Sequence, residues 1–156
     1  EAAIDGLLEA LTLRNEYLRD EVRTALRNSN AAPALFARAG DTQRPVAARL
    51  AALVGLRTLQ PADASPLAAL LGEREPEIRA GAAEALVVFG ASTATPALMK
   101  ALKDPVADVR YFAALAVAQL GTDEARQAIS KAASDEKDPL VRDALMQAGR
   151  LLNRPA

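Results

Sequence analysis

The second half of this chain repeats one pattern three times, and this repetition limits the available folds more than any other feature. Each copy starts near an acidic residue followed by proline, continues through an arginine and then runs on as an alanine-rich apolar stretch. The three copies lie at 75–90, 104–121 and 138–153. Their arginines, Arg79, Arg110 and Arg142, recur with a period of about 31 residues, which is typical of helical repeat proteins. Because each unit of such an array contacts mainly its neighbours, we expect an extended surface rather than one deep pocket.

The spacing of apolar residues inside each copy predicts helices. Within 105–121, Val109, Ala113 and Val117 recur every four residues and belong to one helical face. Asp104 and Asp138, each followed by proline, are expected to cap the starts of helices, and Gly90 and Gly121 to end them. Alanine fills roughly a quarter of the chain, which favours helix, and no stretch alternates as a strand does. The sequence therefore predicts an all-α fold.

These signals divide the chain into about five helix pairs within one domain, 1–156. Residues 61–153 form the regular repeats, and residues 1–60 form degenerate repeats in which Arg23 and Arg49 take the position of the repeated arginine at a shorter spacing. Atypical terminal repeats are expected because they cap the stack. The predicted pairs are 1–13 with 15–28, 32–39 with 45–59, 63–72 with 76–89, 92–103 with 105–120, and 122–134 with 138–152.

Residues 104–121 read Asp-Pro-x-x-x-Val-Arg followed by Ala-Ala-x-Ala-x-x-x-Leu-Gly, and 75–90 and 138–152 follow this pattern more loosely. The motif resembles the HEAT repeat superfamily, and most closely the short bacterial subtype known as phycobilisome-lyase-like HEAT repeats. The resemblance covers 61–153 and extends to 1–60. It implies a right-handed α-α superhelix whose second helices line a concave face, and in this superfamily that face commonly holds a protein partner.

Counting from the repeated arginine predicts which residues face a partner. Offsets −1, +3, +7 and +10 are expected in the core, and offsets +1, +5 and +8 point outward from the second helix of each pair. The outward positions include two alanines, Ala80 and Ala118. The other ten form the predicted partner-binding strip: Leu50, Val54, Arg57, Glu84, Val87, Tyr111, Leu115, Asp143, Gln147 and Arg150. Apolar patches rimmed by charge are typical of interaction sites. The alternative is a phase error of one residue, which would place these side chains in the core.

The repeated arginines have two interpretations of their own. They are either an anion-binding ladder or structural residues, each paired with the acid before its own helix, and the structural interpretation is favoured because such pairs recur with the fold. The acids concerned are Glu75, Asp104 and Asp138. A second series, Arg19, Arg23 and Arg27, is interpreted as a solvated face paired with Glu16 and Asp20 rather than a cationic docking stripe.

The composition argues against catalysis and cofactor binding. The chain has no histidine and no cysteine, which removes the commonest general base, the commonest metal ligand and the thiol nucleophile. The acidic run at Asp135, Glu136 and Asp138 lacks the spacing of a calcium loop and is interpreted as a solvated turn. A net charge of −1 and the absence of tryptophan disfavour nucleic acid, and no apolar run is long enough to cross a membrane. We therefore expect no catalytic, cofactor or metal site.

These observations predict a non-enzymatic scaffold that binds a protein partner of unknown identity along the concave strip. Two alternatives stay open: an auxiliary subunit or domain of an enzyme, as the resemblance to bilin-lyase repeats implies, and an architectural spacer in a larger protein. No residue pattern assigns a compartment, and a cytoplasmic location is the default expectation. The first residue is Glu1 rather than methionine, which indicates a processed or trimmed piece.

Overall fold

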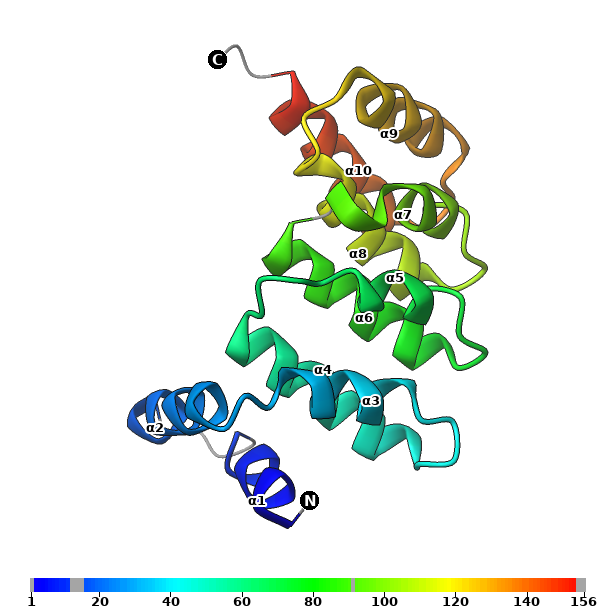
Figure 1. Cartoon of the computed structure of the whole chain (residues 1–156). Helices are drawn as coiled ribbons and strands as arrows, with labels where there is room; N and C mark the ends of the chain where they lie inside the picture. The colour runs from blue at the N-terminus through cyan, green and yellow to red at the C-terminus, as the bar shows by residue number, and fades with distance from the viewer. Residues whose placement is uncertain (1, 12–15, 91, 154–156) are drawn as a thin grey trace. The chain divides into compact units, whose positions relative to one another are not determined.

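The computed structural model describes residues 2–11, 16–90 and 92–153, and all regular structure in this part of the chain is helical (Figure 1). The all-α prediction is therefore confirmed for these residues. The α-helices are α1 (Ala2–Ala10), α2 (Glu16–Asn28), α3 (Ala32–Gly40), α4 (Val46–Leu59), α5 (Pro66–Leu70), α6 (Pro76–Phe89), α7 (Thr95–Ala101), α8 (Ala107–Ala118), α9 (Asp123–Asp135) and α10 (Pro139–Leu152), with a short 3₁₀ helix at Ser92–Ala94 before α7. None of the described helices is long and apolar enough to span a bilayer.

The chain forms two compact units, and the division falls close to the predicted boundary between degenerate and regular repeats. Unit 1 is Glu1–Asp63 and unit 2 is Ala64–Ala156. In unit 1, α3 packs along α4, and α1 contacts both α2 and α4. The guanidinium of Arg49 is buried there and donates from Nε to the carbonyl of Ala39 at 2.8 Å.

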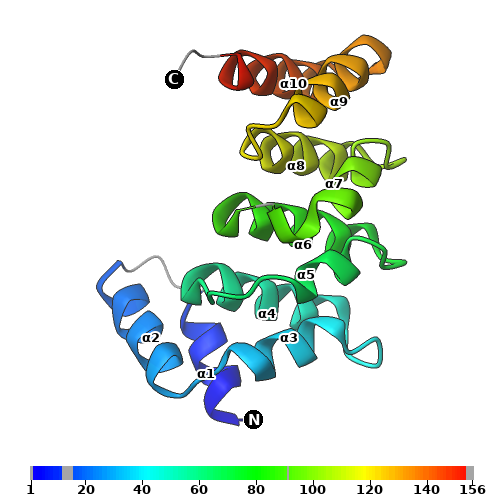
Figure 2. The ribbon, with the colours of Figure 1, turned by 45° about the horizontal axis from the view of Figure 1, so that its top comes forward.

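Unit 2 consists of three helical hairpins, α5–α6, α7–α8 and α9–α10. The second helices pack side by side, with α8 between α6 and α10, while the first helix of each hairpin packs on its own second helix (Figure 2). The residue before each repeated arginine, Ile78, Val109 or Val141, is fully buried or nearly so. Burial of these branched side chains contributes to the close packing of unit 2.

The helix ends follow the predictions in part. Gly90 is the C-cap residue of α6 as predicted, and its φ of +87° is one that glycine adopts without the steric penalty of a Cβ. Gly121, with φ of +66°, lies two residues beyond Gln119, the C-cap residue of α8. The carboxylate of Asp138 caps α10 by accepting from the N–H groups of Leu140 and Val141 at 2.9 and 3.1 Å. The prediction for Asp104 is wrong, because α8 begins only at Ala107 and its N-cap residue is Val106.

Candidate functional site

The repeated arginines of unit 2 join successive hairpins. Arg79 of α6 donates from Nε and Nη2 to the two carboxylate oxygens of Asp104 in the next hairpin, at 2.7 and 2.9 Å. Arg110 of α8 makes the same bidentate contact with Glu136, at 2.7 and 2.8 Å. We call these two contacts the inter-hairpin ion pairs. A bidentate arginine–carboxylate pair fixes orientation as well as distance, so it sets the register of one hairpin on the next.

The carboxylates that these arginines bind are not the ones that the sequence predicted. Pairing of each arginine with the acid before its own helix is wrong for Arg79 and Arg110, because the turn before each helix supplies backbone carbonyls instead. Nη1 of Arg79 donates to the carbonyls of Glu73 and Arg74, both at 2.9 Å. Nη1 of Arg110 does the same with Asp104 and Pro105 at 2.9 and 3.2 Å. Asp104 and Glu136, in the turns before α8 and α10, are thus held by the arginines of the preceding hairpins.

The inter-hairpin ion pairs lower the pKa of both carboxyl groups. Hydrogen bonds from Arg110 lower the pKa of Glu136 to about 2, against the opposing effect of burial. Partial burial acts to raise the pKa of Asp104, but hydrogen bonds from Arg79 and from the Val106 N–H hold it below its usual range. Both carboxylates are therefore ionised near neutral pH. Nε and Nη2 of Arg79 and Arg110 already donate to carboxylates of the chain. These arginines therefore do not form the anion-binding ladder considered from the sequence.

The unit 2 part of the partner-binding strip comes from α6, α8 and α10. On α8, the side chain of Tyr111 is 36% exposed. Leu115 lies one turn further along the same helix and is half-buried. On α6 the members are Glu84, at the same offset as Leu115, and Val87, three residues further along, and both are half-buried. On α10 the strip ends in polar side chains that are all exposed: Asp143, Gln147 and Arg150.

Several contacts hold the strip in place. The ring of Tyr111 meets that of Phe112 edge to face, with centroids 5.3 Å apart and an interplanar angle of 86°. The amide of Gln147 donates to Asp143 at 2.7 Å, one turn away on the same helix. The structure thus places an aromatic and an aliphatic side chain on α8 beside a charged border on α10. Whether a partner binds there stays a prediction.

Unit 1 carries the remaining three members of the predicted strip, all on α4. Val54 is 44% exposed, and Leu50 and Arg57 are half-buried. None of the three lies in the core of unit 1, whereas their neighbours Leu53 and Leu56 are buried. The arginine series on α2 is partly self-paired as expected, since Nη1 of Arg23 lies 3.4 Å from the carboxylate of Asp20.

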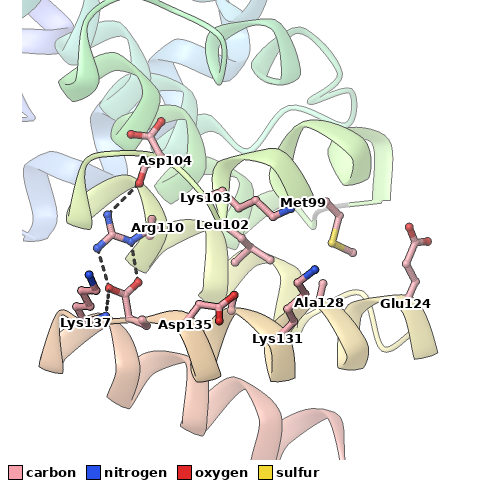
Figure 3. A pocket seen from close by; sticks show the side chains of 12 residues that line it. Met99, Leu102, Lys103, Asp104, Arg110, Glu124, Ala128, Lys131, Asp135 and Lys137 are labelled. Carbon is pink, nitrogen blue, oxygen red and sulfur yellow. Dashed lines mark hydrogen bonds and ion pairs between the residues drawn. The ribbon is translucent and has the colours of Figure 1, made fainter.

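Sequence reasoning missed a groove on the first-helix side of unit 2, which has a volume of about 520 Å³ (Figure 3). Met99 of α7 and Leu102 line it from one hairpin, and Ala128 and Ala132 of α9 line it from the next. Three of the chain's four lysines also line it: Lys103, Lys131 and Lys137.

This groove can accept an apolar group bordered by anionic ones, since its apolar residues lie among lysines. Its charge is mixed, because Glu124 and Asp135 lie beside Lys131 along α9. In the described residues no cluster of acidic side chains is arranged to hold a metal ion. The spacing of Glu124, Ala128, Lys131 and Asp135, three or four residues apart, marks one helical face and was the available signal in the sequence.

Comparisons with known proteins agree on the fold. The family model described as HEAT repeats matches residues 64–149. No curated protein matches the chain. Among solved structures, the complex of CpcE and CpcF of phycocyanin lyase from Nostoc sp. PCC7120 is similar, with a TM-score of 0.68 and 20% identity over 94% of this chain and 98% of the other.

Two artificial proteins are similar as well. An engineered protein has a TM-score of 0.66 and 18% identity, covering 97% of this chain and 79% of its own. A designed armadillo repeat protein in complex with the peptide (KR)4 has a TM-score of 0.62 and 18% identity, covering 97% and 82%. At these identities the likeness concerns the fold.

Proposed function

The chain belongs to the HEAT repeat family, and from this premise we propose that it is a non-enzymatic scaffold that binds a protein partner through the strip on its second helices. The observation that carries the proposal is the exposed Tyr111 beside Leu115 on α8, bordered by the charged side chains of α10. Tyrosine supplies a large contact area with few rotatable bonds, and such residues dominate binding energy in protein interfaces. A stable contact would bury roughly 800 Å² on each partner.

The similar solved structures support a role in binding proteins. One is a complex of two different polypeptides, and another is a repeat protein in complex with a peptide. A surface built from parallel helices suits an extended or helical segment of a partner, because each hairpin adds an equivalent row of side chains. The mixed charges of Glu84, Asp143 and Arg150 favour a partner segment that carries both signs.

A photocrosslinker in place of Tyr111 tests the proposal in extracts of the source organism. The same group in place of Tyr17, an exposed tyrosine of α2 outside the strip, is the matched control. We expect one protein to be captured from position 111 and not from position 17. With that protein purified, Tyr111→Ala and Leu115→Ala should each weaken binding by about 2 kcal/mol, roughly thirtyfold in Kd.

Thermal unfolding separates a binding role from a structural one. Tyr111→Ala should lower the melting temperature by only a few degrees, through loss of the ring contact with Phe112, and should leave the chain folded. Leu140→Ala, which truncates an exposed leucine outside the strip, should leave Kd unchanged. The proposal fails if Tyr111→Ala unfolds the chain, or if Leu140→Ala weakens binding as much as the strip variants do.

A second candidate, an accessory subunit that handles a pigment or substrate for an enzyme, is favoured by two observations. One similar structure is a complex of phycocyanin lyase, and the groove between α7 and α9 has the size of a small-molecule site. This candidate predicts a shifted visible absorption band when the protein is mixed with a bilin. The shift should be lost on replacing Met99 at the groove by aspartate, and an unshifted spectrum rejects the candidate.

A further inference from the structure

The groove between α7 and α9 lies inside unit 2 and is bounded on both sides by hairpins of the chain. The first helices α5 and α7 pack on each other, whereas α7 and α9 stand apart and leave a space of about 520 Å³. Leu102 in this space is only 6% exposed, and Met99, Ala128 and Ala132 are half-buried. A partly enclosed apolar space of this volume is typical of a small-molecule site.

Three of the charged side chains that line the groove belong to the inter-hairpin ion pairs. Arg110 and Glu136 bind each other, and Asp104 is held by Arg79 of the preceding hairpin. The charges of these residues are balanced by their partners within the chain. The other charged lining residues therefore set the charge that a ligand meets.

These other residues are three lysines and two acids, and all five side chains are exposed: Lys103, Lys131, Lys137, Glu124 and Asp135. In the part of the chain that the structure describes, none of the three lysines makes an ion pair. Three ammonium groups against two carboxylates leave one positive charge. This balance favours a ligand with a single negative charge.

The apolar part of the groove is aliphatic. No aromatic side chain is among its lining residues in the described chain, so a ring or a nucleobase would find no stacking partner. The flexible thioether of Met99 can follow the shape of a hydrocarbon chain. Figure 3 shows Lys103, from the turn after α7, and Lys131, on α9, on opposite walls of the groove with Leu102 between them.

We propose that this groove binds an aliphatic monocarboxylate. The hydrocarbon chain lies on Met99 and Leu102, and the carboxylate accepts from the ammonium groups of Lys103 and Lys131. Lysine suits this role because its flexible stem and three donors can follow the head group. The site is built from the first helices, so it is separate from the partner-binding strip and goes beyond the scaffold function.

The proposal shares its groove with the second candidate function but requires no enzyme. A chain that binds an aliphatic carboxylate and leaves the spectrum of a bilin unshifted would reject that candidate and support this proposal. The two can therefore fail separately.

The probe is decanoate, titrated into the full chain with isotope-labelled methionine methyl groups and followed by NMR. The chain has two methionines, Met99 in the groove and Met146 on α10 outside it. We expect decanoate to shift the Met99 methyl resonance until saturation and to leave that of Met146 unchanged. Equal shifts of both resonances would indicate non-specific adsorption and would overturn the proposal.

Lysine variants test the head-group contact. Lys103→Gln and Lys131→Gln should each weaken decanoate binding about threefold, and the two changes together about tenfold. Lys100→Gln, at the exposed lysine of α7 that does not line the groove, is the matched control and should have no effect. Ala128→Leu, which fills the groove without adding charge, should abolish saturable binding, and the melting temperature of each variant checks that it is folded.

Decanol, which has the same chain without the charge, should bind about tenfold more weakly than decanoate. The proposal is overturned if decanol binds as tightly, or if both lysine variants bind as the original chain does. It is also overturned if a peptide of glutamate and leucine shifts the Met99 resonance and decanoate does not, because the groove would then serve an acidic protein segment.

Discussion

At the scale of single residues, arginine is suited to its repeated position because its planar guanidinium has two edges. One edge binds carbonyls of its own turn, and the other binds the carboxylate of the next hairpin. Lysine has no second edge and could not make both contacts with fixed geometry. The side chains of Arg110 and Glu136 are only 17% and 6% exposed, so water screens this pair less than the surface pair of Arg23 and Asp20.

The lowered pKa of Glu136 predicts how acid affects stability. A carboxyl group whose pKa is about 2 in the folded chain and near its ordinary value of about 4.3 in the unfolded chain contributes stability above pH 4.3. That contribution is lost as the pH falls from about 4.3 towards 2. Glu136→Gln, which cannot ionise, should therefore lower the free energy of unfolding at pH 6 by on the order of 1–2 kcal/mol.

Chemical denaturation at pH 6 and at pH 2.5 measures this effect. The difference between the original chain and Glu136→Gln should shrink towards zero at the lower pH. Asp20→Asn, which removes an exposed acid, is the control and should change stability by less than about 0.5 kcal/mol at either pH. A difference that persists unchanged at pH 2.5 would show that ionisation of Glu136 is not the cause.

Residue spacing alone could predict that the arginines are structural but not which acids they hold. An acid before the same helix is the nearer choice in the sequence, and for Asp104 it also satisfied the pattern of a helix cap. The structure instead uses Asp104 across 25 residues, because stacking places the turn of one hairpin beside the arginine of the previous one. A contact of this kind depends on how hairpins stack, which local patterns do not encode.

At the scale of helices, positions of termini follow from proline and glycine more closely than from apolar spacing. The predicted helices at 63–72 and 92–103 are shorter in the structure, where α5 and α7 occupy 66–70 and 95–101. Both have proline in their first turn, at Pro66 and Pro96, where its fixed φ suits helix initiation. The second helices α6 and α10 end within one residue of their predicted bounds.

Two glycines should respond to alanine in opposite directions. Gly121 has a positive φ, so Gly121→Ala should destabilise the chain by about 1 kcal/mol. Gly6 lies inside α1 with no atom within 4 Å of an added Cβ, so Gly6→Ala should stabilise by about 0.5–1 kcal/mol. Urea denaturation of both variants measures the changes. A loss of stability in Gly6→Ala would contradict the expected gain in helix propensity.

At the scale of the whole molecule, the contacts of unit 2 could be predicted from the sequence further than those of unit 1. The regular pattern of 61–153 was sufficient to predict the hairpins of unit 2. In unit 1 the spacing is irregular, and contacts such as the ion pair between Asp5 and Arg38 join residues far apart without a repeat to predict them. The groove between α7 and α9 escaped prediction for a similar reason, since it arises where two first helices stand apart.

Hydrogen exchange should show how stability is distributed within unit 2. Helix α8 is covered by α6 on one side and by α10 on the other, whereas α10 is covered by α8 alone among the second helices. Stability in repeat proteins depends on contacts between neighbours, so amides of α8 should exchange last. We expect their free energy of opening to exceed that of α10 by about 1 kcal/mol or more. Equal protection of the two helices would contradict this distribution.

The inter-hairpin ion pairs lie in the turns inside the hairpins, whereas the connections between hairpins, at the opposite ends of the second helices, contain Gly90 and Gly121 with left-handed backbone. The opposite edge is joined by the continuous backbone and, between the ends of α6 and α8, by a hydrogen bond from the side-chain amide of Gln119 to the carbonyl of Val87 at 2.7 Å. Strong acid, which protonates carboxylates, would therefore loosen the edge that carries the ion pairs and leave the other edge joined.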